Sequence, residues 1–164
     1  MESVRRLVVG SVLLLASADT PVAQPAPDFS GRWVLTSASP TRPNYDQFWF
    51  GTEATLAQDA KRLVIVRLSP APRREATFAL DSSESRNEYV VDGQRIIRDS
   101  RARASGGNVL ISTDTTDANG QRWLSNIVRW SLDAEGALVV TDTEICGRGE
   151  CPSVITTLKF QRKP

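Results

Sequence analysis

The chain is a regular succession of short runs with alternating polarity, separated by turn signals, and this pattern limits the fold more than any other feature. Asp92-Gly93 and Asn119-Gly120 are strong hairpin signals, because both dipeptides accept the backbone angles of tight turns. Polar and apolar side chains alternate with a period of two between these turns, as in Val154–Phe160. No segment after Asp28 sustains a helical stripe, although Asn44–Ala57 leaves room for a short helical turn. The pattern predicts an all-β protein.

Eight to ten antiparallel strands account for the alternation. The expected strands span residues 30–38, 52–58, 62–68, 74–80, 88–91, 94–104, 108–115, 121–132, 137–146 and 153–162. Short connections place consecutive strands side by side, so an up-and-down meander is the simplest topology. Because closure removes exposed sheet edges, we expect the meander to close into a barrel. We predict one domain over residues 28–163.

The start of this domain resembles the first strand of lipocalin-like barrels. The matching residues are Phe29-Ser30-Gly31-Arg32-Trp33, which contain the Gly-x-Trp element of that strand. Short later elements resemble small secreted bacterial proteins of the same kind, among them Val91-Asp92-Gly93 and Trp130-Ser131-Leu132-Asp133. Thr141-Asp142-Thr143 matches a further lipocalin signature only in part. The resemblance implies a lipocalin-like barrel whose closed end is plugged by Trp33.

The first 18 residues have the layout of a signal peptide. Arg5 and Arg6 precede an apolar run, Leu7–Ala18, which is too short to span a membrane. We expect cleavage after Ala18, with Ala23 as the alternative site and an uncleaved N-terminal anchor as the alternative interpretation. Residues 19–27 are rich in Pro and Ala and read as a flexible leader. The protein is therefore expected in the periplasm or outside the cell.

The two cysteines agree with export. Cys146 and Cys151 flank a four-residue loop between two expected strands. An even cysteine count after a signal peptide favours a disulfide, here closing the tip of a hairpin. A redox pair is the alternative, but the spacing is not Cys-x-x-Cys.

Composition excludes several kinds of chemistry. The chain has no His, so imidazole bases, Ser-His or Cys-His pairs and His-containing zinc sites are excluded. Two cysteines cannot form a four-cysteine zinc site. A net charge of +1 does not favour a dedicated nucleic-acid binder. We expect no cofactor, no metal and no enzymatic activity, with a carboxylate-only enzyme left open.

An aromatic cluster lies between the first two expected strands. Tyr45, Phe48, Trp49 and Phe50 fall within six residues. In lipocalin-like barrels this connection lies at the open end and can act as a lid over an apolar ligand. The alternative is that Trp49 and Phe50 pack into the core. Trp130, on the strand face of Val128 and Leu132, is a further candidate ligand contact.

Two charged stretches complete the set of candidates. Asp142 and Glu144 share one strand face, and if that face looks inward the two carboxylates line the barrel mouth. The alternative is a strand end in solvent. Arg95, Arg98, Arg101 and Arg103 form a basic run, which we interpret as an exposed edge strand protected by charge. Attraction to an anionic surface, such as lipid headgroups, is the alternative.

These features favour an exported barrel that binds a small, partly apolar molecule, with Asp142 among its ligand contacts. The alternative is a secreted interaction protein, such as an inhibitor of a hydrolase that inserts the leader into its target. Neither function involves nucleic acid or a membrane span.

Overall fold

A computed structural model describes residues 27–39, 50–146 and 154–164 of the chain. Ten antiparallel strands form one sheet. They are β1 (Gly31–Ser39), β2 (Glu53–Gln58), β3 (Arg62–Ser69), β4 (Arg74–Ala79), β5 (Asp81–Val91), β6 (Gln94–Ser105), β7 (Asn108–Thr116), β8 (Arg122–Leu132), β9 (Leu138–Cys146) and β10 (Val154–Lys163). The all-β prediction is confirmed.

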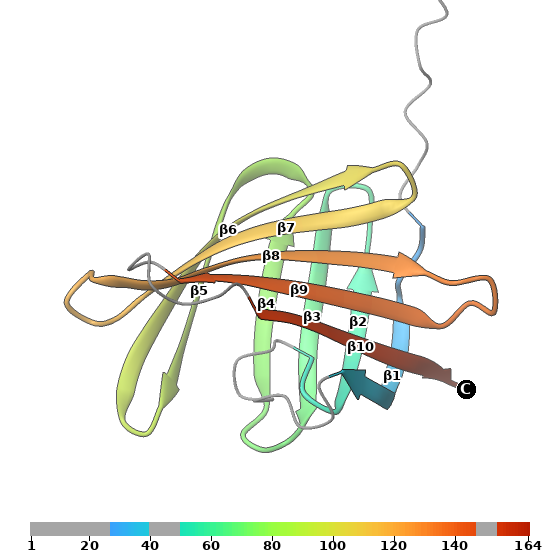
Figure 1. Cartoon of the computed structure of the whole chain (residues 1–164), viewed down its shortest axis with the longest axis horizontal. Coiled ribbons are helices and arrows are strands. Elements are labelled where there is room, and N and C mark those ends of the chain that lie inside the picture. The colour runs from blue at the N-terminus through green and yellow to red at the C-terminus, as the bar shows by residue number, and fades with distance from the viewer. Residues whose placement is uncertain (1–26, 40–49, 147–153) are drawn as a thin grey trace, which may run out of the picture.

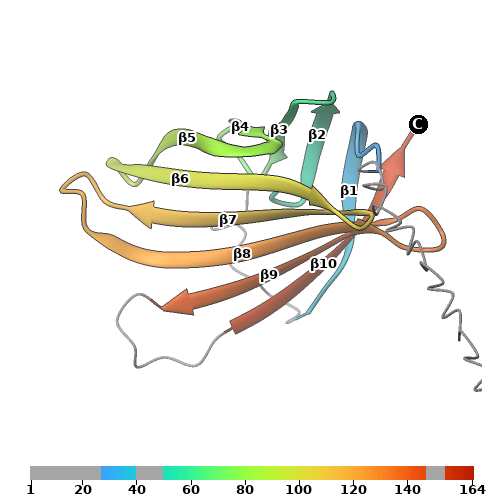
Figure 2. The same ribbon diagram turned by 90° about the horizontal axis from the view of Figure 1, so that it is seen from above.

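The strands form a nearly closed meander barrel (Figure 1). Apart from β4 and β5, strands that are consecutive in the sequence pair with each other, and β1 pairs with β10, for example Leu35 with Phe160. The hydrogen-bonded order begins at β4 and ends at β5, so only the β4–β5 seam lacks a backbone ladder. Figure 2 shows β6–β10 forming one wall and β1–β4 lying across it.

Side chains join the two strands at this seam. The amide of Asn87 accepts from the backbone N–H of Thr77 at 2.9 Å and donates to its carbonyl at 3.0 Å. Ser85 accepts from the backbone N–H of Ala79 at 2.8 Å. The Asn87 side chain thus satisfies the two backbone groups of Thr77 that a neighbouring strand would otherwise pair, and these groups would be costly to leave unpaired.

The observed strands agree closely with the expected ones, except at β5. We expected a short strand over 88–91, whereas β5 begins at Asp81. The first half of β5 lacks alternating apolar residues. Its outer positions are charged or polar, and its inner residues Ser85 and Asn87 form hydrogen bonds to the backbone of β4 across the seam. The polarity pattern therefore concealed half of the strand.

The apolar core fills one end of the barrel. Trp33, expected to be buried, is fully buried there, and its indole N–H donates to the carbonyl of Phe29 at 2.8 Å. The guanidinium of Arg162 lies 4.8 Å from the centre of the Trp33 ring. This end carries the β2–β3, β4–β5, β6–β7 and β8–β9 turns, and we call it the plugged end.

The opposite end is where β1, β3, β5, β7 and β9 finish. We call it the turn end, after the β5–β6 and β7–β8 turns. The connection from β1 to β2 also leaves and returns here. Residues 1–26, including the expected signal peptide and most of the leader, lie outside the described residues.

Candidate functional site

The inner surface of the barrel becomes more polar toward the turn end, although Ile96 and Leu124 keep buried apolar side chains there. On β9, the inward residues Leu138 and Val140 are followed by Asp142, all nearly fully buried. On β6, Ala102 lies toward the plugged end, whereas Arg98 lies toward the turn end. The buried polar residues at the turn end are Arg67, Arg74, Asn87, Arg98, Ser100, Thr113, Thr115, Asn126, Asp142 and Thr156. With the half-buried Tyr89 and Glu144, we call this set the polar inner cluster.

The side chain of Asp142 points into the barrel. A carboxylate at the barrel mouth, as expected from the sequence, requires this orientation. Its side chain is buried, with 3% of the residue exposed. The amide nitrogen of Asn126 donates to both carboxylate oxygens at 3.0 Å. Burial raises the pKa of Asp142 to about 6, against the lowering effects of the Asn126 hydrogen bond and of Arg98. The carboxyl therefore titrates close to neutral pH.

Glu144 follows on the same inner face, one step nearer the turn end. Burial raises the pKa of Glu144, while the positive charge of Arg98 opposes this shift. Its negative charge also raises the pKa of Asp142. The two carboxylates and Arg98 thus form one electrostatic group.

Two arginines from opposite sides of the seam meet at one aromatic ring. The guanidinium carbon of Arg74, on β4, lies 4.7 Å from the centre of the Tyr89 ring, and that of Arg98, on β6, lies 5.2 Å from it. Both arginines are at least nine-tenths buried. Burial lowers the pKa of Arg98, and the charge of Arg74 lowers it further. The cluster thus brings two buried guanidinium groups to the same ring.

The interpretation of the basic run as an edge strand is wrong. β6 lies between β5 and β7, and Arg98 is buried inside the barrel. Arg95 and Arg101 are exposed and pair with Glu88 and Glu84 on β5. Strand parity carried the missed signal, because Arg98 has the parity of Ile96 and Ala102. The run itself suggested a uniform charged surface.

Hydroxyl groups line the wall between the arginines and the carboxylates. Ser100 and Thr113 form a hydrogen bond of 2.9 Å between their side-chain oxygens. Thr115, opposite Arg98 in the β6–β7 register, is fully buried. Its hydroxyl has no hydrogen-bond partner within the described part of the chain.

Phe50 and Trp130 form the apolar floor of the cluster. Their ring centres lie 4.5 Å apart, and Phe50 also packs on Phe160 at 5.1 Å. Both residues are buried in the core, which agrees with the alternative that Phe50 packs into the core. Tyr45, Phe48 and Trp49 lie outside the described residues.

Gly51 determines the path of the backbone directly after Phe50. Its φ is +57°, and a Cβ there would lie 2.0 Å from the carbonyl oxygen of Ser69 and 2.8 Å from Cδ of Arg67. The backbone N–H of Thr52 donates to the same carbonyl at 2.8 Å. Only glycine fits this close approach, which holds β2 beside the buried Arg67.

Arg67, Arg74, Tyr89 and Asn126 were not singled out from the sequence. Asn126 interrupts the apolar inner face of β8, and this interruption marks the inner polar site. Cys146 ends β9 at the turn end of the barrel. Its expected partner Cys151 lies outside the described residues, and so does the expected bridge.

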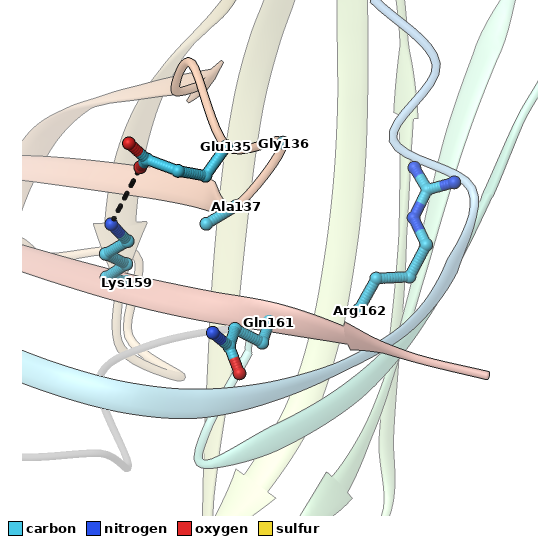
Figure 3. A pocket seen from close by; sticks show the side chains of 6 residues that line it. All are labelled: Glu135, Gly136, Ala137, Lys159, Gln161 and Arg162. Carbon is cyan, nitrogen blue, oxygen red and sulfur yellow. Dashed lines mark hydrogen bonds and ion pairs between the residues drawn. The ribbon is translucent and has the colours of Figure 1, made fainter.

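A separate hollow of about 510 Å³ opens on the outside, at the plugged end (Figure 3). Its charged groups are paired. Lys159 contacts Asp133 at 2.7 Å and Glu135 at 3.5 Å, and Arg162 donates to the carbonyl of Asp28. Both cations of this surface hollow are therefore already engaged by groups of the chain.

Across the described ranges, there is no group of three or more His, Cys, Asp or Glu placed to hold a metal ion. The same ranges contain no helix long and apolar enough to cross a membrane. Comparison of the chain with protein-family models and with curated proteins finds no match.

Proposed function

We propose that the protein is a barrel that binds a small, partly apolar molecule at its turn end. The observation that carries this proposal is the polar inner cluster, buried beside the apolar floor of Phe50 and Trp130. Buried charges are costly, and an apolar interior of similar volume would often be at least as stable. Such an arrangement is typical of binding sites, where polar groups orient a ligand against an apolar wall.

The proposal includes export and a disulfide. We infer that residues 1–18 are removed and that Cys146 pairs with Cys151, because the N-terminal pattern and the even cysteine count agree. N-terminal sequencing of the secreted protein should begin at Asp19, or at Gln24 for the alternative site. An intact mass that includes Met1, with both thiols open to alkylation, contradicts this part.

Uptake of a neutral apolar dye, N-phenyl-1-naphthylamine, tests the binding proposal. We expect fluorescence enhancement with a stoichiometry of one dye per barrel. Thr115→Phe places a ring in the polar inner cluster and should abolish uptake. Ser112→Phe, on the exposed outer face of the same strand, is the matched control and should bind normally.

Near-ultraviolet circular dichroism must show that both variants remain folded. If Thr115→Phe does not fold, Thr156→Leu, a smaller change at another buried inner position, takes its place. Absence of uptake by the wild-type protein, or equal uptake by the inner and outer variants, contradicts the proposal.

The alternative, an interaction protein such as a hydrolase inhibitor, is favoured by one surface feature. Ile127, Ile145 and Ile155 are exposed at 46%, 44% and 61% on the outer face of β8–β10. Thr143 lies opposite Ile127 on one side and Ile155 on the other, so these side chains are neighbours. Exposed apolar groups of this kind are typical of protein contacts.

Native mass spectrometry of the protein recovered from its own compartment distinguishes the two functions. A retained small molecule supports the binding barrel. A stoichiometric protein partner without a small molecule supports the interaction protein.

A further inference from the structure

Charged side chains are unevenly distributed over the outside of the barrel. On β5 and β6 they form a ladder of ion pairs, namely Arg86 with Asp99, Glu88 with Arg95 and Glu84 with Arg101. The outside of β8, β9 and β10 is different. We call its outward-facing residues within 125–129, 141–145 and 155–157 the outer wall. These residues are Ile, Ser or Thr, with Arg129 as the single charged member.

The exposed isoleucines form the apolar centre of the outer wall. Ile127, Thr143 and Ile155 are register partners in turn across the three strands. Ile145 lies one step nearer the turn end, opposite Ser125. Figure 2 shows the three strands side by side in one wall of the barrel. Neighbouring exposed aliphatic side chains of this kind are typical of a protein contact.

Two opposite charges at the outer wall are incompletely used within one barrel. Arg129 is exposed and makes neither a hydrogen bond nor an ion pair within the described ranges. Asp114, on β7 beside the wall, accepts from Ser125 and Arg122, but both contacts go to Oδ1. Its Oδ2 has no hydrogen bond from any residue that the structure describes. Arg129 is opposite Leu110, four residues or about 13 Å along β7 from Asp114, so the two charges do not meet.

A two-fold axis brings these charges together between two copies of the chain. We place the axis across the strands at the level of Ile127, between two outer walls stacked face to face. Ile127 and Ile155 then face their own counterparts. Arg129, one step from the axis, faces the level of Asp114 in the copy, which lies on the adjacent strand about 5 Å to the side. The same rotation places the copy's Arg129 beside the first Asp114.

We propose that the outer wall is the interface of a homodimer, in which two copies stack about this axis and exchange two Arg129–Asp114 ion pairs. The charge pattern favours a second copy over an unrelated protein, because one rotation satisfies both charges of both chains. The interface lies outside the barrel, so the inference does not depend on the proposed ligand. So few large apolar groups predict a weak dimer, with a Kd between about 1 µM and 1 mM.

Sedimentation equilibrium of the purified protein tests self-association. We expect a monomer–dimer equilibrium that depends on protein concentration. Ile127→Glu places two carboxylates against each other on the axis and should leave the protein monomeric throughout the same range. Val90→Glu, at a position 59% exposed on the outside of β5, is the matched control and should dimerise as the wild type does.

Near-ultraviolet circular dichroism must show that the Ile127→Glu protein is folded. If it is not, Ile155→Glu at the other exposed isoleucine on the axis takes its place. A wild-type protein that stays monomeric to about 1 mM overturns the proposal, and the outer wall is then left to a different protein. A dimer that the glutamate variant leaves intact overturns it as well.

A charge exchange tests the geometry of the dimer. Arg129→Asp and Asp114→Arg should each weaken dimerisation about tenfold, because each puts like charges together twice in the dimer. The double variant restores opposite charges and should recover the wild-type affinity to within about threefold. Glu75→Arg, an exposed charge reversal on β4, is the control and should change little. A double variant that dimerises no better than the single ones overturns the proposed pairing.

Discussion

Replacing Asp142 by Asn should stabilise the protein at alkaline pH. The folded protein raises the pKa of Asp142 from 3.8 to about 6. Each pH unit corresponds to about 1.4 kcal/mol, so keeping the carboxylate ionised inside the barrel costs about 3 kcal/mol of folding free energy. The folded state binds this proton more tightly than the unfolded state. Its contribution to stability is therefore present below about pH 4 and is lost as the pH rises through about 6.

Asn at this position remains neutral at every pH and can still accept a hydrogen bond from Asn126. Urea unfolding of both proteins between about pH 4 and pH 8 measures the effect as a difference in unfolding free energy. The two curves should coincide near pH 4 and separate by up to about 3 kcal/mol near pH 8, with the variant the more stable.

Glu75→Gln, which removes an exposed carboxylate on β4, is the control and should shift the curve little. A constant difference between wild type and Asp142→Asn would refute the reasoning, and so would a variant that is less stable near pH 8. A constant difference would mean that the favourable interactions of the carboxylate balance the cost of burial, and a less stable variant near pH 8 would mean that they outweigh it.

Three further substitutions test the fold. Trp33→Ala should cost about 3–5 kcal/mol in urea unfolding because it empties a fully buried site, and a loss below about 1 kcal/mol would contradict the plugged end. Gly51→Ala should cost more than about 2 kcal/mol, since its Cβ would strike the backbone carbonyl of Ser69, and an unchanged midpoint would contradict that contact. Asn87→Ala should leave two backbone groups of Thr77 unpaired and speed amide hydrogen exchange at the seam. Faster exchange only elsewhere in β4 would show that other contacts hold the seam together.

The strand order and most strand limits could be predicted because turns and alternation are local signals. Asp92-Gly93 and Asn119-Gly120 fall at observed turns between adjacent strands. The first half of β5 could not be predicted from alternation, because Asn87 pairs with a neighbouring strand through its side chain. Such pairing depends on closure of the whole barrel, which a local pattern does not encode.

The candidate site was predictable in part. The change from apolar to acidic residues along one face of β9 predicted Asp142 at a barrel mouth, on the condition that this face looks inward. The burial of Asp142 meets this condition. Arg98 was misassigned because four arginines within nine residues suggested a surface, although strand parity placed one of them inside. Arg74 meets the ring of Tyr89, which also contacts Arg98, only across the seam, and no sequence spacing reveals this contact between strands.

The most direct test of the account is the location of a bound ligand. Backbone amide shifts of the labelled protein, recorded by nuclear magnetic resonance during titration with anilinonaphthalene sulfonate, report that location. The account predicts saturable changes centred on Arg98, Thr115 and Asp142 and extending to Trp130. Changes confined to the outer face around Ile127 and Ile155, or no saturable change, would contradict a ligand site inside the barrel.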